Sequence, residues 1–119
     1  MDNENKKVKE FFPQEYFDIL EAIDHASKIF DLPVKYTTSA IGVECYYSGK
    51  KIIACTSPGN KKVNFSLYLT QDVLNQIKKL GVSLSSLEEI GDDYYKVPKE
   101  IYQNKDLFAK IFRLVFDSA

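Results

Sequence analysis

The sequence predicts an α+β domain: a three- to four-stranded antiparallel meander with an N-terminal helix and two to three C-terminal helices packed on one sheet face. Strand-like segments within residues 41–69 are joined by two compact turns. Apolar residues at helical spacing precede and follow this region. A length of 119 residues, 45% of them hydrophobic, suits a single folded domain at 11–119 after a flexible polar N-terminus at 1–10.

The first helix is predicted to begin near Pro13 or Gln14 and to end before Pro33. Its apolar residues recur at steps of three and four, which gives an amphipathic helix one buried stripe. They are Tyr16, Ile19, Leu20, Ile23, Ala26 and Phe30. We expect this stripe to pack on the apolar side of the sheet, and residues 34–38 to form a short extended lead into it.

Two turns predict the register of the sheet. A two-residue turn at Ser48-Gly49 places Tyr47 opposite Lys50 and Cys45 opposite Ile52. A four-residue loop at 57–60 sets Phe65 opposite Ile52 and Val63 opposite Ala54. The predicted apolar face carries Val43, Cys45, Tyr47, Ile52, Ala54, Val63, Phe65 and Leu67. Cys55 falls on the other face, so we expect both cysteines to be reduced.

The remaining elements follow from capping and breaking residues. Thr70 is placed to cap a helix that ends at Gly81. Residues 85–88 match the capping-box pattern of a short helix. Residues 94–97 are predicted to form a fourth, edge strand, because Pro98 stops strand pairing. The last helix is predicted to begin near Asn104.

Charge and motifs disfavour several classes of function. A formal net charge of −1 supplies no overall attraction to nucleic acid or to an anionic membrane. The sequence has neither an apolar run of about 18 residues nor a secretory signal, so we expect a cytoplasmic protein without membrane contact. Spacing assembles no nucleophile–base pair, carboxylate pair or glycine-rich phosphate loop, so we expect a noncatalytic protein without a cofactor.

Binding to another protein is the function that the sequence favours, and one predicted surface lies on the second sheet face. Tyr46, Ile53 and Tyr68 lie there among charged and polar neighbours. Protein contact surfaces combine large apolar or aromatic anchors with polar groups in this way. We therefore expect these three residues to contact a partner.

A second predicted surface lies on the last helix, whose apolar residues occupy more than half of its circumference. Phe108, Phe112 and Phe116 form a line at steps of four. The line either packs between the sheet and the neighbouring helices, which we favour, or meets a second copy of the chain in a homodimer.

Two alternatives use charged side chains. Lysines flank both turns and predict weak binding to DNA phosphates; they are Lys50, Lys51, Lys61 and Lys62. Asp18, Glu21 and His25 lie on one side of the first helix, opposite its apolar stripe. Such a set could hold a divalent cation, although a charged outer helix face explains it more simply.

Two short motifs support a resemblance. They are Tyr-Ser-Gly-Lys-Lys-Ile at 47–52 and Val-Asn-Phe-Ser-Leu at 63–67, followed by a helix, a tyrosine-rich segment ending at Pro98 and a closing helix. This order resembles the small α+β domains of the MmcQ/YjbR type and the related YdhG-like domains. The resemblance implies DNA binding for the first type, through the four turn lysines. For some YdhG-like members it implies frataxin-like iron handling, through Glu15, Asp18 and Glu21.

Overall fold

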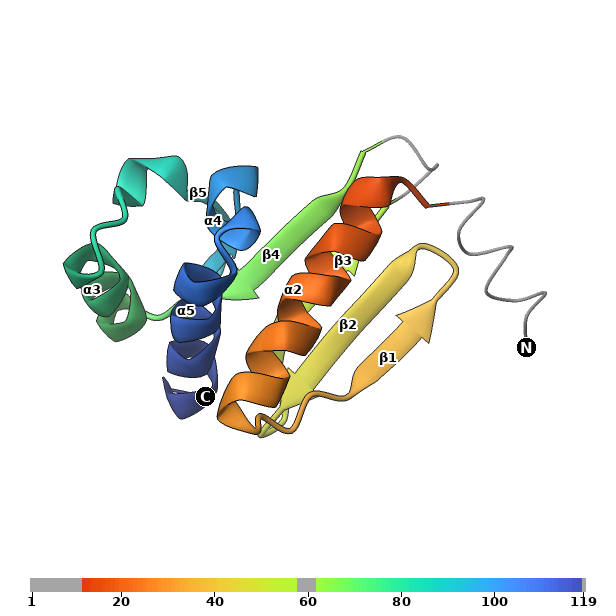
Figure 1. The fold of residues 1–119 in the computed structure, drawn as a ribbon, viewed down its shortest axis with the longest axis horizontal. Coiled ribbons are helices and arrows are strands. Elements are labelled where there is room, and N and C mark those ends of the chain that lie inside the picture. Colours follow the sequence, from red (N-terminus) through yellow and green to blue (C-terminus); the bar gives the residue numbers. More distant parts are fainter. Residues whose placement is uncertain (1–11, 58–61, 119) are drawn as a thin grey trace.

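The computed structural model describes residues 12–57 and 62–118. These residues form an α+β domain with one six-stranded antiparallel sheet in the order β1-β2-β3-β4-β6-β5 (Figure 1). The elements in chain order are α2 (Gln14–Phe30), β1 (Tyr36–Ser39), β2 (Gly42–Tyr47), β3 (Lys50–Thr56), β4 (Asn64–Tyr68), α3 (Gln71–Lys79), η2 (Leu84–Ser86), β5 (Glu88–Gly91), β6 (Tyr94–Lys96), α4 (Lys99–Gln103) and α5 (Lys105–Ser118). The segment predicted to be flexible, 1–10, lies outside the described residues.

The sheet has more strands than predicted because two segments that were not read as strands pair at its edges. The extended lead before β2 becomes β1, which pairs antiparallel with β2. The predicted capping-box helix is wrong: Glu88 begins β5, and only the 3₁₀ turn η2 precedes it. Asp92 and Asp93 adopt positive φ angles of 50° and 69° in the tight turn between β5 and β6. Consequently β6 lies between β4 and β5 and is not an edge strand.

The first turn has the predicted register, but a β-bulge shifts the pairing beyond it. Tyr47 lies opposite Lys50, and the turn residues between them have φ angles of 54° and 74°. Cys45, however, pairs with Ile53 instead of Ile52, which becomes the extra residue of β3. Ile52 and Ile53 are therefore both fully buried, and the prediction that Ile53 faces outward is wrong.

The pairing of β3 with β4 also differs from the prediction. Cys55 lies opposite Phe65, because residues 57–63 connect the two strands where a four-residue loop was expected. Residues 58–61 of this connection lie outside the described residues. Since Cys45 and Cys55 now share the apolar face, their predicted separation onto two faces is wrong; both are buried and free. Ala54 lies on the outer face, opposite Glu44.

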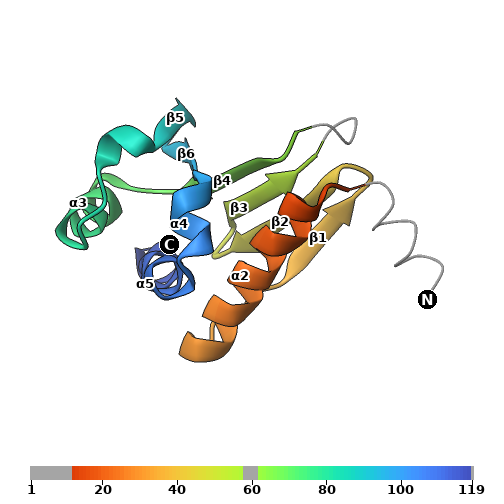
Figure 2. The same ribbon diagram turned by 45° about the horizontal axis from the view of Figure 1, so that its top comes forward.

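The helices gather on the apolar side of the sheet, where the core lies. Helix α2 packs against β3, α4 and α5, and both views place these helices on the same side (Figures 1 and 2). Four of its five buried residues belong to the predicted stripe; Ala22 is the fifth, and the predicted Leu20 and Phe30 are only partly buried. Thr70 caps α3 as predicted, accepting a hydrogen bond from the Val73 N–H at 3.4 Å. In the described parts of the chain, every helix is too short or too polar to cross a membrane.

Candidate functional site

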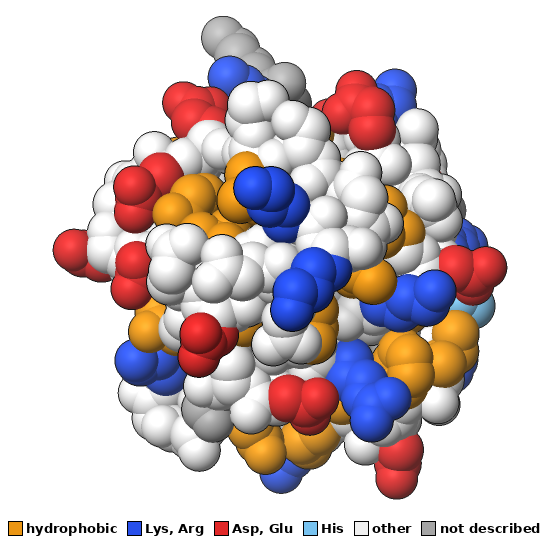
Figure 3. Space-filling model, turned by 90° about the vertical axis from the view of Figure 1, so that its left-hand side faces the viewer, with side chains coloured by type: hydrophobic (Ala, Val, Ile, Leu, Met, Phe, Trp, Pro, Cys, Tyr) orange, Lys and Arg blue, Asp and Glu red, His pale blue; other side chains and the backbone are white. Residues whose placement is uncertain are grey.

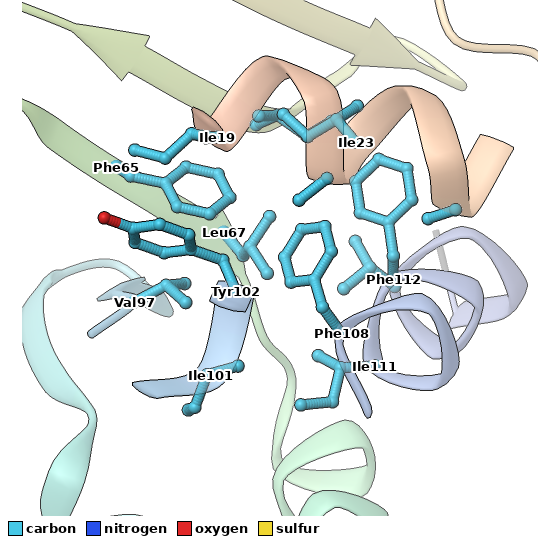
Figure 4. Packing of buried hydrophobic residues seen from close by; sticks show 14 of the residues in the cluster. Ile19, Ile23, Phe65, Leu67, Val97, Ile101, Tyr102, Phe108, Ile111 and Phe112 are labelled. Atoms are coloured by element: carbon cyan, nitrogen blue, oxygen red, sulfur yellow. The ribbon is translucent and has the colours of Figure 1, made fainter. Parts of the chain in front are cut away.

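The phenylalanine line of α5 belongs to the core. Phe108 and Phe112 are fully buried and Phe116 is 5% exposed, which confirms the favoured arrangement within the monomer. The rings pack in series at centroid distances of 5.5 Å and 5.2 Å, with Ile23 of α2 close by (Figure 4). These three side chains therefore expose little surface in the monomer. The homodimer alternative stays a prediction.

The surplus apolar surface of α5 lies instead at Leu114, which is only partly buried. Leu114 lines a groove of about 490 Å³ together with Phe30 at the end of α2 and Leu80 after α3. Leu80 is 39% exposed. The three side chains come from segments far apart in sequence, and together they form the apolar part of the groove. The apolar pattern of the sequence correctly indicated surplus apolar surface on α5. It assigned that surface to the phenylalanine line, whereas the partly exposed residue is Leu114.

Basic side chains surround this apolar floor. Lys79 of α3 and both Lys110 and Arg113 of α5 line the groove, and Asp117 is the one acidic residue among its lining side chains. The Arg113 guanidinium lies 5.0 Å from the centre of the Phe30 ring, and its Nε lies 3.7 Å from the Asp117 carboxylate. Figure 3 shows this side of the molecule, where Lys and Arg side chains gather beside exposed hydrophobic ones. Three positive charges against one negative leave the groove with a net charge of +2.

The outer face of the sheet holds a cluster of tyrosines and lysines. Tyr46 is 50% exposed, and Tyr68 lies opposite Tyr94 with ring centroids 5.5 Å apart. The Lys50 ammonium donates a hydrogen bond to the Tyr68 hydroxyl at 3.0 Å, which raises the pKa of Lys50. The Tyr94 hydroxyl in turn donates to the Lys51 carbonyl at 2.7 Å. Tyr94 was missed because the sequence predicted a strand at 94–97 but did not indicate that it pairs with β4.

The three described lysines of those predicted to bind DNA lie at opposite ends of β3. Lys50 and Lys51 lie at the turn between β2 and β3, where Lys51 also pairs with Glu44 at 3.3 Å. Lys62 lies just before β4, in the connection at the other end of β3, and Lys61 is outside the described residues. Lys50 and Lys51 are therefore separated from Lys62 by the length of β3, and DNA binding through these lysines stays a prediction.

Two of the three residues predicted to hold a metal, Asp18 and Glu21, are engaged in other contacts. Glu21 pairs with Lys105 at 3.1 Å, and Asp18 accepts a hydrogen bond from Gln14 at 3.0 Å. His25 is half-buried, and its Nε2 has no hydrogen-bond partner within the described chain. Over residues 12–57 and 62–118, no three His, Cys, Asp or Glu side chains are grouped so that they could hold a metal ion.

Comparison with known proteins returned no similarity: no family model, no curated protein and no solved structure matches the chain. The resemblance to MmcQ/YjbR and YdhG-like domains therefore stays a prediction.

Proposed function

We propose that this chain is a noncatalytic binding domain whose groove between α2, α3 and α5 takes an acidic amphipathic helix from a partner protein. The groove itself carries the proposal: it has a volume of about 490 Å³, and three basic side chains border its apolar floor. Helix-in-groove recognition places apolar anchors at i, i+3, i+4 and i+7 into such a floor.

Charge complementarity selects the acidic partner. A helix that inserts leucines between Phe30 and Leu114 would bring its flanking residues close to Lys79, Lys110 and Arg113. Glutamates at those flanking positions would be attracted, whereas lysines would meet like charges. The partly exposed Leu80 and Leu114 supply the apolar area whose burial stabilises the complex.

The geometry favours this groove over the tyrosine–lysine cluster of the sheet. In that cluster the Lys50 ammonium already donates to the Tyr68 hydroxyl, and the Tyr94 hydroxyl donates to the Lys51 carbonyl. The Lys51 charge is paired with Glu44. A partner there would compete with contacts that the monomer has formed. In the groove, by contrast, Lys79 and Lys110 have no ion-pair partner among the described residues.

The test is an amide NMR titration with two synthetic 14-residue peptides. Both carry leucines at helical i, i+3, i+4 and i+7 spacing; one has glutamates and the other lysines at the remaining outward positions. We expect the acidic peptide to shift the amides of Phe30, Leu80 and Leu114, and the basic peptide to leave them unchanged. Lys110→Glu should raise the dissociation constant of the acidic peptide about tenfold, because the loss of one charge-assisted contact has an effect of that size.

A matched control removes exposed surface elsewhere: Tyr46→Ser changes a residue of the sheet face that is 50% exposed. This variant should bind the acidic peptide as the natural chain does. Shifts confined to the sheet face, or equal binding of both peptides, would overturn the proposal. Groove amides that broaden with protein concentration when no peptide is present would identify a second copy as the occupant and would also overturn it.

A further inference from the structure

A second pocket, of about 270 Å³, opens where β4 begins and β6 runs into α4. Its lining is mixed, and its apolar part, which we call the apolar floor, comes from the buried residues Val63, Phe65 and Val97. The Val97 N–H donates a hydrogen bond to the Phe65 carbonyl at 2.9 Å, which ties the two sides of the floor together. Tyr102 of α4 closes one wall, and its ring packs against Phe65 at 6.0 Å.

Three lysines converge on this pocket: Lys62, Lys96 and Lys99. None of them forms an ion pair with another residue in the described parts of the chain. Other lysines of the domain do pair with carboxylates, among them Lys28, Lys51 and Lys105. Lys96 is half-buried, so part of its side chain lies against protein. The pocket thus concentrates positive charge that the described fold does not neutralise by direct pairing.

Two carboxylates also line the pocket, and one of them is held by a tyrosine. The Tyr102 hydroxyl donates a hydrogen bond to Glu15 Oε1 at 2.7 Å. Figure 4 shows this hydroxyl directed away from the core. Burial, followed by the Glu15 contact, raises the pKa of Tyr102, so the phenol stays protonated and keeps donating. Glu88 is the second carboxylate, so the described residues of the lining carry three positive charges against two negative, a net charge of +1.

We propose that this pocket binds a small organic phosphate, with the phosphate on the lysines and the carbon skeleton over the apolar floor. Lysine ammoniums are strong donors to phosphate oxygens. Pockets for drug-sized ligands measure about 300–1,000 Å³, so a cavity of about 270 Å³ suits a small ligand. The apolar floor distinguishes a phosphate ester from free phosphate, because only the ester carries a group to bury there.

The experiment is an amide NMR titration of the full chain at low salt with phenyl phosphate and, separately, inorganic phosphate. Phenyl phosphate should give saturable shifts at Val97, Lys99 and Tyr102. The double variant Lys96→Gln/Lys99→Gln should raise the dissociation constant for phenyl phosphate at least tenfold, because each lost hydrogen bond involves a charged group. A matched double variant, Lys50→Gln/Lys51→Gln, removes the same charge on the other end of the sheet and should leave the constant unchanged.

The possible outcomes distinguish binding of a phosphate ester from binding of free phosphate and from nonspecific charge attraction. Saturable binding of phenyl phosphate, tighter than that of inorganic phosphate and lost only in the pocket variant, supports the proposal. Equal affinity for both compounds would overturn it, since the apolar floor would then contribute nothing. Shifts that rise linearly without saturation, or that weaken equally in both double variants, would overturn it as nonspecific charge attraction. Unchanged spectra with both compounds would overturn it as well.

Discussion

Replacing Cys55 by alanine should change how the stability of the domain depends on pH. Cys55 lies in β3, is fully buried, and faces Phe65 across the sheet. Burial raises the pKa of its thiol from 9.0 to about 12. The folded state therefore keeps the thiol neutral at a pH at which the unfolded chain already ionises it.

The magnitude follows from these two pKa values. Because the folded pKa is the higher one, the neutral thiol contributes its full share of the free energy of unfolding below pH 9.0. That contribution is lost as the pH rises toward 12. At pH 10 the unfolded thiol is about ten-elevenths ionised and the folded thiol is not, which lowers the free energy of unfolding by about 1.4 kcal/mol. A folded pKa one unit lower would give nearly the same loss, so the result hardly depends on the upper value.

The assay is urea unfolding followed by far-UV circular dichroism, at pH 7 and pH 10 with a reductant. Cys55→Ala cannot lose a thiol proton, so its free energy of unfolding should fall less between the two pH values than that of the natural chain, by about 1.4 kcal/mol. Ile53→Val is the control, because it removes buried volume from the same strand, costs about 0.5–1.5 kcal/mol and does not titrate. If Cys55→Ala and the natural chain lost stability equally, the thiol would not be buried as described.

Three further substitutions test the fold by the same unfolding assay. Gly42 has φ of 152°, and an added Cβ would lie 2.7 Å from the Thr56 Cα, so Gly42→Ala should cost about 2 kcal/mol or more; an unchanged midpoint would contradict the close approach of β2 to β3. Phe112→Ala empties a fully buried site and should cost about 3–5 kcal/mol, and a smaller loss would mean that the ring is not central to the core. Thr70→Ala removes the cap of α3 and should cost about 1 kcal/mol; no loss would show that the 3.4 Å contact with the Val73 N–H contributes nothing.

Features that depend on neighbouring residues could be predicted from the sequence. The start of α2 at Gln14 follows Pro13, and the start of α3 follows its Thr70 cap. The turn at Ser48-Gly49 also forms as expected. Helix spacing, capping and turn conformation are local properties, because each concerns side chains within a few residues of one another.

The bulge at Ile52 was not predictable in this way. Strict alternation along β3 leaves Ile52 and Ile53 on opposite faces, whereas the bulge buries both. The gain comes from burying two isoleucines in a core that the sheet shares with α2 and α5, which strand alternation does not represent. One extra residue then changed the face on which Cys55 lies.

The sequence by itself determined that helices precede and follow a β-rich segment along the chain, and which residues of α2 and α5 form apolar stripes. Only the tertiary structure decided the order of strands and the two candidate sites. The groove brings together Phe30, Leu80 and Leu114, and the second pocket brings together Glu15 and Tyr102. Residues so far apart meet because burial of the shared core selects the packing of distant elements, and that free energy belongs to the whole fold and to no single segment.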